Sequence, residues 1–305
     1  MKGKITKSTG SWYDIQDEQG QLIQGRLRGK FKHLDLKVTN PIAVGDQVEF
    51  EMEEDGRAVI TVIAPRENYI VRKSPHKTAH AHLLASNIDQ AVLIATIAQP
   101  RTSTGFIDRF MVSAEAFRIP LVLVLNKSDL LTPGEEAVRE EITNIYENIG
   151  VEVLHTSVPE QKNLDAFKDC LRGKTSLISG HSGVGKSTLV NHIAPWLDLK
   201  TSEISDFSGK GTHTTTFAQM FDMGENTYII DTPGIKELGL IDIEKEELAH
   251  YFPEMRELLG DCRFHNCLHM NEPGCVVKKL VDEGLISESR YYNYLGMLEE
   301  HDSYR

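Results

Sequence analysis

A glycine-rich segment, residues 180–187, has the composition and spacing of a phosphate-binding loop. It reads Gly-His-Ser-Gly-Val-Gly-Lys-Ser, follows the apolar run Thr175–Ser179 and precedes a segment with helical spacing. Glycines let the backbone curl with its N–H groups pointing inward, and the next helix directs its positive dipole end to the same place. We predict that a nucleotide triphosphate binds here, with Lys186 at its β- and γ-phosphates and the Ser187 hydroxyl on Mg²⁺. The predicted contacts are Gly180, His181, Ser182, Gly183, Val184, Gly185, Lys186, Ser187 and Thr188.

A second motif, Asn-Lys-Ser-Asp at 126–129, indicates which base is bound. It comes directly after the apolar run 121–125, at the carboxyl end of a predicted strand, where ligands of open α/β sheets bind. The Asp129 carboxylate can accept hydrogen bonds from N1–H and the 2-amino group of guanine, whereas adenine would leave it unpaired. Asn126 would brace the loop, the Lys127 stem would lie along the base, and a backbone N–H at 156–157 would reach the guanine oxygen. The predicted base contacts are Asn126, Lys127, Asp129, Thr156 and Ser157.

Two further segments are expected to respond to the γ-phosphate. Asp231 and Gly234 belong to an Asp-Thr-Pro-Gly motif after the predicted strand 226–230. The acid would hold Mg²⁺ through water and the Gly234 N–H would meet the γ-phosphate. Residues 205–217 lie between this motif and the phosphate loop and contain three consecutive threonines. One of their hydroxyls would be the second Mg²⁺ ligand. Of Thr214, Thr215 and Thr216 we choose Thr215, with Thr214 as a further nucleotide contact.

These motifs occur in an unusual order, because the base-recognition motif precedes the phosphate loop. A circular permutation explains this order, since the termini of a domain usually lie close together at its surface. Many GTPases place a water-orienting Gln after the motif that ends at Gly234, but here Ile235 stands there, and an aliphatic side chain cannot orient water. We therefore predict slow intrinsic hydrolysis, with His213 as the candidate catalytic residue beside Lys186 and Thr215.

Three of the four cysteines and two histidines fall within residues 262–275, where Cys262, Cys267, His269 and Cys275 form the pattern Cys-x₄-Cys-x-His-x₅-Cys. Three thiolates and one imidazole suit a tetrahedral Zn²⁺, and a closed set of four ligands indicates a structural ion. The predicted ligands are Cys262, Cys267, His269 and Cys275, with His265 as a rival to His269. The fourth cysteine, Cys170, lies in a predicted amphipathic helix and is expected in the core.

The elements that must position these residues form three units. Short alternating segments with turn signals over residues 1–63 predict a small closed β-barrel. Apolar runs alternating with helical patterns from residue 87 predict a mostly parallel sheet with helices on both faces. Helical segments at 244–259, 276–283 and 288–299 surround the cysteines. We divide the 305 residues into an OB-fold barrel (1–68), a polar linker (69–86), a GTPase domain (87–240) and a zinc-binding helical domain (241–305).

Charge is distributed unevenly along the chain. The net charge is −12, yet residues 1–82 carry 13 Lys and Arg against 11 Asp and Glu, whereas the other 223 residues carry 20 against 34. Basic residues occupy every second position from Arg26 to Lys32, so a strand would gather them on one face, either as an RNA-binding stripe or as an ordinary solvated surface. The chain has no apolar run of membrane-spanning length and no signal peptide, so we expect a cytoplasmic protein.

Together these features resemble the RsgA-type (YjeQ/YloQ) small-ribosomal-subunit biogenesis GTPases. The likeness includes the permuted motifs, the barrel, Asn-Ile-Asp-Gln at 87–90 and the cysteine pattern that follows Phe-Pro-Glu at 252–254. It implies a GTPase with GTP or GDP, Mg²⁺ and one structural Zn²⁺. It also implies a protein that binds the small (30S) subunit and its rRNA late in maturation, hydrolyses GTP slowly alone and is stimulated by the subunit. We expect it to act as a monomer away from membranes.

Three alternatives remain open from the sequence. A permuted GTPase could act on the large ribosomal subunit instead, which a comparison of stimulation by the two subunits would test. A P-loop kinase or ATPase would prefer ATP, contrary to the expectation from Asp129. A non-enzymatic RNA-binding module would keep its function after Lys186→Ala.

Overall fold

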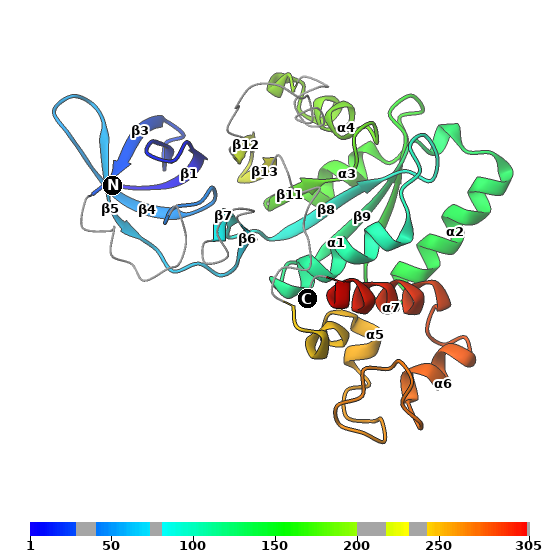
Figure 1. Cartoon of the computed structure of the whole chain (residues 1–305). Coiled ribbons are helices and arrows are strands. Elements are labelled where there is room, and N and C mark those ends of the chain that lie inside the picture. The colour runs from blue at the N-terminus through cyan, green and yellow to red at the C-terminus, as the bar shows by residue number, and fades with distance from the viewer. Residues whose placement is uncertain (29–40, 74–80, 200–217, 232–242, 304–305) are drawn as a thin grey trace.

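The computed structural model describes residues 1–28, 41–73, 81–199, 218–231 and 243–303 (Figure 1). These residues form an N-terminal β-barrel, a central α/β unit and a C-terminal group of helices, which confirms the predicted architecture. None of the described helices is long and apolar enough to cross a membrane.

The barrel consists of β1 (Lys2–Ser8), β2 (Tyr13–Asp17), β3 (Leu22–Leu27), β4 (Gln47–Met52) and β5 (Ala58–Ile63). Its strands pair in the order β1-β2-β3-β5-β4, and β4 pairs back with β1 to close the barrel. The β3–β5 pair is parallel, and the other pairs are antiparallel. Apolar side chains at alternate positions, including Ile5, Ile15, Phe50 and Ile60, fill the interior. This closed five-stranded arrangement is that of an OB-fold.

The central sheet has the order β10-β9-β8-β11-β13-β12. Five strands are parallel, namely β8 (Gln90–Ala95), β9 (Leu121–Asn126), β10 (Glu152–Thr156), β11 (Thr175–Ser179) and β13 (Thr227–Asp231). The strand β12 (Gln219–Gly224) runs antiparallel to β13. Every residue of β8, β9 and β11 is buried, as expected for parallel strands that are covered on both faces.

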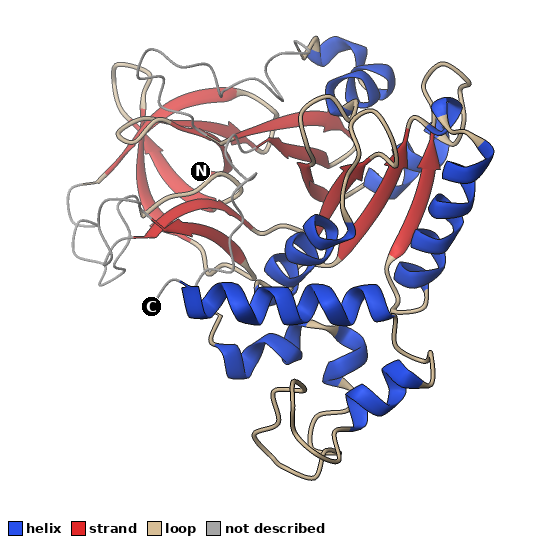
Figure 2. Cartoon of the chain, turned by 45° about the vertical axis from the view of Figure 1, so that its right-hand side comes forward, coloured by secondary structure: helices blue, strands red, loops and turns tan. Residues whose placement is uncertain are grey.

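Helices cover both faces of this sheet (Figure 2). Apolar residues of α1 (Thr104–Ala116) and α2 (Pro133–Glu147) pack on one face, and those of α3 (Leu164–Leu171) and α4 (Lys186–Ile193) pack on the other. Short 3₁₀ turns, η2 (Ser128–Leu130) and η3 (Pro195–Leu197), follow β9 and α4. Cys170 of α3 lies in the core, as predicted.

The C-terminal helices are η5 (Lys245–Tyr251), α5 (Pro253–Arg256), α6 (Val276–Asp282) and α7 (Glu288–Ser303). Their core includes Phe252, Tyr294 and Met297 and extends to Val112 of α1, so α7 lies along the central unit (Figure 2). The prediction of one helix over 244–259 is wrong: a 3₁₀ helix ends before Phe252, and a new helix begins at Pro253. Proline lacks a backbone N–H and suits the first position of a helix better than its interior.

The segment predicted as a polar linker contains two strands. β6 (Tyr69–Lys73) and β7 (Ala81–Ser86) form an antiparallel pair, and Ile70 and Ala85 are buried against the core of the central unit. The pairing of β1 with β12 was not predicted either; it joins the barrel to the central sheet, with Lys7 opposite Gln219.

Candidate functional site

The glycine-rich loop joins β11 to α4 at the carboxyl edge of the sheet. Gly180 and Gly185 have φ values of 144° and 95°, which disfavour any residue with a side chain. A Cβ at Gly180 would lie 2.1 Å from the carbonyl oxygen of Ile94, and one at Gly185 would lie 2.5 Å from Nδ2 of Asn126. The loop therefore needs glycine at both positions to pass between neighbouring strands.

The Lys186 side chain is buried and folds back into this loop. Its Nζ donates to the carbonyl oxygens of Gly180 at 2.8 Å and His181 at 2.7 Å. The ammonium group thus lies inside the curl of the backbone, where a phosphate oxygen would be neutralised. Ser187 follows in the first turn of α4 and is also buried, whereas Thr188 is exposed.

Asn126, at the end of β9, joins three segments of the site. Its Nδ2 donates to the carbonyl oxygen of Val184 at 2.9 Å, and its Oδ1 accepts from the Thr156 hydroxyl at 2.9 Å. Ser128 continues this network by donating to the carbonyl oxygen of Thr156 at 3.2 Å. All four residues are buried, so the phosphate loop is held directly against the base-recognition motif.

The Asp129 carboxylate is fixed by a hydrogen bond to one of its two oxygens. Its Oδ1 accepts from the Ser157 hydroxyl at 2.7 Å, and that hydroxyl in turn accepts from the Glu160 backbone N–H at 3.2 Å. Asp129 remains half-buried. Lys127 has a left-handed backbone with φ 62°, and its Nζ donates to the Gln99 carbonyl oxygen at 2.8 Å. The sequence motif therefore gives a carboxylate fixed by Ser157 and a lysine bonded to the loop that follows β8.

Asp231 ends β13, directly beside the phosphate-loop strand, with Ile178 of β11 as its register partner. Burial raises the pKa of Asp231 to about 6, and the nearby Lys186 ammonium counteracts part of that increase. A partly buried carboxylate of this kind gains from a divalent cation nearby. The remaining predicted residues, His213, Thr214, Thr215 and Gly234, lie outside the described residues, as do Thr216 and Ile235.

Sequence reasoning did not identify the loop between β8 and α1 as part of the site. Two observations place this loop beside the site. The Lys127 ammonium donates to the Gln99 carbonyl oxygen, and a Cβ added at Gly183 would lie 3.6 Å from the Pro100 side chain. The Phe106 ring stacks on His181, with ring centroids 3.9 Å apart and planes inclined by 32°. One signal was available, because this loop also follows a buried parallel strand and therefore ends at the same sheet edge.

The four predicted zinc ligands converge in the C-terminal unit. Their ligand atoms all lie within 4.8 Å of one another. Nδ1 of His269 is 3.6 Å from Sγ of Cys262 and 3.4 Å from Sγ of Cys275, and the two sulfurs are 4.0 Å apart. Tetrahedral Zn²⁺ with its usual bond lengths would separate its ligands by about 3.5–3.8 Å, so the cluster fits this ion. His265 is exposed and does not belong to the cluster.

The surroundings of the cluster also suit a cation. Burial raises the pKa of Cys267 to about 12, so thiols would need a positive charge nearby to ionise. The loop is fixed by Glu272, which accepts from the backbone N–H groups of Leu268 and Met270 at 2.9 Å each. The Tyr291 hydroxyl donates to the carbonyl oxygen of His269 at 2.7 Å. These hydrogen bonds fix the backbone of the loop that carries His269, whose Nδ1 lies close to the sulfurs of Cys262 and Cys275.

The basic stripe is described only as far as Arg28. Arg26 of β3 and Arg28, which follows the end of β3, are both exposed, but both face carboxylates of the barrel. Arg26 pairs with Glu53 at 2.8 Å, and Arg28 lies 3.7 Å from Glu51. These side chains line a shallow cavity of about 410 Å³. The stripe is therefore partly neutralised within the protein, which its sequence pattern did not reveal.

Comparisons with known proteins cover nearly the whole chain. The family model described as RsgA GTPase matches residues 63–241, and the RsgA N-terminal domain model matches residues 2–60. The small ribosomal subunit biogenesis GTPase RsgA of Cytophaga hutchinsonii is 56% identical over 100% of both chains. Its counterpart in Christiangramia forsetii is 50% identical over 100% of this chain and 98% of its own.

Solved structures agree in fold. YjeQ from Thermotoga maritima superposes with a TM-score of 0.79 at 36% identity, covering 98% of this chain and 97% of its own. YloQ, described as a circularly permuted GTPase, gives a TM-score of 0.77 at 31% identity, covering 100% and 96%. Since the two family models and the full-length relatives match nearly the whole chain, this chain belongs to the RsgA GTPase family.

Proposed function

We propose that this GTPase binds the small ribosomal subunit and acts in its late maturation, with hydrolysis of GTP to GDP and phosphate stimulated by the subunit. The full-length relatives named as small-subunit biogenesis GTPases carry this proposal. Their names give no support to the large-subunit alternative. The nucleotide-site geometry agrees, because Asn126 bonds the base-recognition motif to the phosphate loop.

Within that function we assign roles to the site residues. Asp129 reads guanine, with Asn126, Lys127, Thr156 and Ser157 supporting the base site. Lys186 and the loop 180–188 hold the phosphates. Ser187 and Thr215 ligate Mg²⁺, Asp231 holds it through water, and His213 serves hydrolysis with Lys186 and Thr215; Thr214 and Gly234 complete the nucleotide contacts. The hydrogen-bonded Asp129 and the buried Lys186 support the first two assignments.

The barrel would supply the rRNA contacts, through the stripe that begins with Arg26 and Arg28. Lysine and arginine provide the phosphate contacts that dominate nucleic-acid affinity. The charge of residues 83–305 favours this assignment of the rRNA contacts to the barrel, because their 34 acidic side chains would repel RNA. We place the protein in the cytoplasm as a monomer, and assign one structural Zn²⁺ to Cys262, Cys267, His269 and Cys275.

We retain the division into a barrel (1–68), a connecting segment (69–86), a permuted GTPase domain (87–240) and a zinc-binding domain (241–305). The burial of Ile70 and Ala85 against the central core gives the connecting segment a structural role in addition. It would hold the barrel at a set position on the GTPase domain.

GTP hydrolysis measured with purified small subunits, large subunits or neither tests the proposal directly. The salt concentration must be fixed, because the RNA contacts are ionic. We expect stimulation by the small subunit alone. Equal stimulation by both subunits would contradict the proposed partner, and preferential ATP turnover would contradict the nucleotide. Lys186→Ala should abolish activity in every condition.

A further inference from the structure

The helix α1 lies between the phosphate loop and the C-terminal unit, and its first turns contact both. Toward the nucleotide site, Phe106 in the first turn stacks on His181, with ring centroids 3.9 Å apart. The carbonyl oxygen of the same His181 accepts from the Lys186 ammonium at 2.7 Å. The position of α1 therefore affects His181, whose carbonyl oxygen holds the Lys186 ammonium within the phosphate loop.

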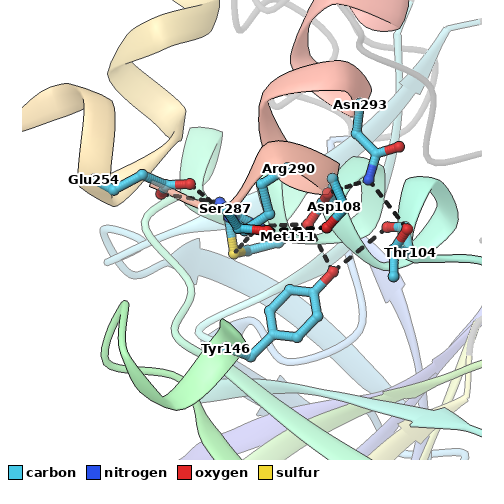
Figure 3. A network of polar contacts seen from close by, with 9 residues as sticks. Thr104, Asp108, Met111, Tyr146, Glu254, Ser287, Arg290 and Asn293 are labelled. Atoms are coloured by element: carbon cyan, nitrogen blue, oxygen red, sulfur yellow. Dashed lines mark hydrogen bonds and ion pairs between the residues drawn. The ribbon is translucent and has the colours of Figure 1, made fainter. Parts of the chain in front are cut away.

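On its other side, the same part of α1 carries a buried polar network with α7 (Figure 3). Asn293 of α7 donates to Asp108 at 2.6 Å and to the Thr104 hydroxyl at 3.3 Å. A Cβ at Gly105 would lie 3.2 Å from Oδ1 of Asn293, so α7 lies directly against the first turn of α1. Phe106 is thus preceded and followed by residues that contact the C-terminal unit.

Arg290 fixes this arrangement. Its guanidinium pairs with Asp108 and also with Glu254 of α5, where the Nε–Oε1 distance is 2.5 Å. The Tyr146 hydroxyl of α2 donates to Asp108 at 2.7 Å. Arg290 and Asp108 are 1% and 0% exposed, so neither charge has water as a substitute partner. A displacement of α7 would leave buried charges unpaired unless α1 moved with it.

From these contacts we propose that Asn293 and Arg290 of the C-terminal unit are positioning residues for the phosphate loop. They set the first turn of α1, Phe106 transmits that position to His181, and His181 sets the loop around Lys186. The proposal rests on the nucleotide site of the GTPase and is independent of ribosome binding. It gives a route between the zinc-bearing unit and the nucleotide through α1.

The chain offers a matched control at the other end of the same helix. Arg256 of α5 pairs with Glu115 of α1 at 2.8 Å, and both side chains are partly exposed. This ion pair joins the same two units, but Glu115 lies in the last turns of α1, away from the phosphate loop. Arg256→Ala therefore removes a contact between the units without touching the proposed route.

The test measures the Kd of an N-methylanthraniloyl-GDP probe for the full chain, without ribosomes. We expect Asn293→Ala and Phe106→Ala each to raise this Kd by about three- to tenfold, since coupling through packed networks is typically of that size. Phe106→Tyr keeps the ring and should recover most of the loss. Arg256→Ala should leave the Kd within about twofold of the wild-type value.

A double-variant cycle separates positioning from general loosening of the fold. Because both residues act through one series of contacts, Phe106→Ala combined with Asn293→Ala should raise the Kd little more than the larger single effect. Fully multiplicative effects, or a wild-type Kd for Asn293→Ala in a folded protein, would overturn the proposal. If Asn293→Ala does not fold, the Phe106→Ala and Phe106→Tyr pair still decides whether the ring sets the loop: equal affinities for the two variants would refute it.

Discussion

Replacement of Asp231 by asparagine should stabilise the nucleotide-free protein although it removes a proposed functional group. Burial raises the pKa of this carboxyl from its ordinary value of 3.8 to about 6, with the Lys186 charge offsetting part of the effect. Native protein therefore disfavours the ionised form relative to the unfolded chain. The resulting destabilisation is absent below the unfolded pKa and grows as pH rises toward the folded pKa.

The pKa difference sets the expected size of the effect. The rise of the Asp231 pKa from 3.8 to about 6 corresponds to about 3 kcal/mol of unfolding free energy. The wild-type protein is less stable by this amount above pH 7. At pH 5 the same pKa difference lowers the unfolding free energy of the wild-type protein by about half as much. Asp231→Asn is neutral at every pH, so its advantage over the wild type should roughly double between pH 5 and pH 8.

Denaturant unfolding of the two proteins, at several pH values and without nucleotide or added Mg²⁺, measures this difference. Asp261→Asn, which changes an exposed carboxylate, serves as the control and should show no such trend. An Asp231→Asn protein that is less stable than the wild type, or equally stabilised at pH 5 and pH 8, would refute the reasoning. The same variant should bind Mg²⁺-nucleotide more weakly, so its stability and its function should change in opposite directions.

Three other changes have defined outcomes. Asp129→Ala should weaken GDP binding at least about tenfold in a fluorescence titration, because guanine would lose its acceptor; unchanged affinity would remove Asp129 from the base site. Cys262→Ser should lower the zinc content measured by mass spectrometry and destabilise the C-terminal helices by about 3 kcal/mol or more, whereas His265→Ala should retain both zinc and stability. Glu53→Gln should strengthen binding to small subunits about twofold, since it releases Arg26 from an exposed ion pair. Weaker binding would count against an rRNA contact by the stripe.

The sequence was most informative where one local pattern determines structure. Buried parallel strands appear as continuous apolar runs, and glycines at positions 180 and 185 are needed because a Cβ would collide with backbone or side-chain atoms. The cysteine spacing predicted the cluster of Cys and His side chains for a similar reason, since four ligands within fourteen residues can bind one ion.

Elements that depend on distant partners were missed. β6 and β7 contain charged and histidine residues, so their sequence resembles a polar loop. They form strands because they pair with each other and because Ile70 packs into the central core. Likewise, nothing in the local sequence connects Arg290 with Asp108, which lies 182 residues earlier in the chain. The pairing of Arg26 with Glu53 also depends on which strands of the barrel are neighbours.

The junction between barrel and central sheet has a consequence for solubility. β1 pairs with β12, the Lys4 ammonium lies 3.8 Å from the centre of the Tyr228 ring, and Gln16 donates to Asp222 at 2.6 Å. The barrel thereby covers one end of an outer strand whose N–H and C=O groups would otherwise be open to pairing with another copy. A fragment lacking the barrel should therefore self-associate as its concentration rises.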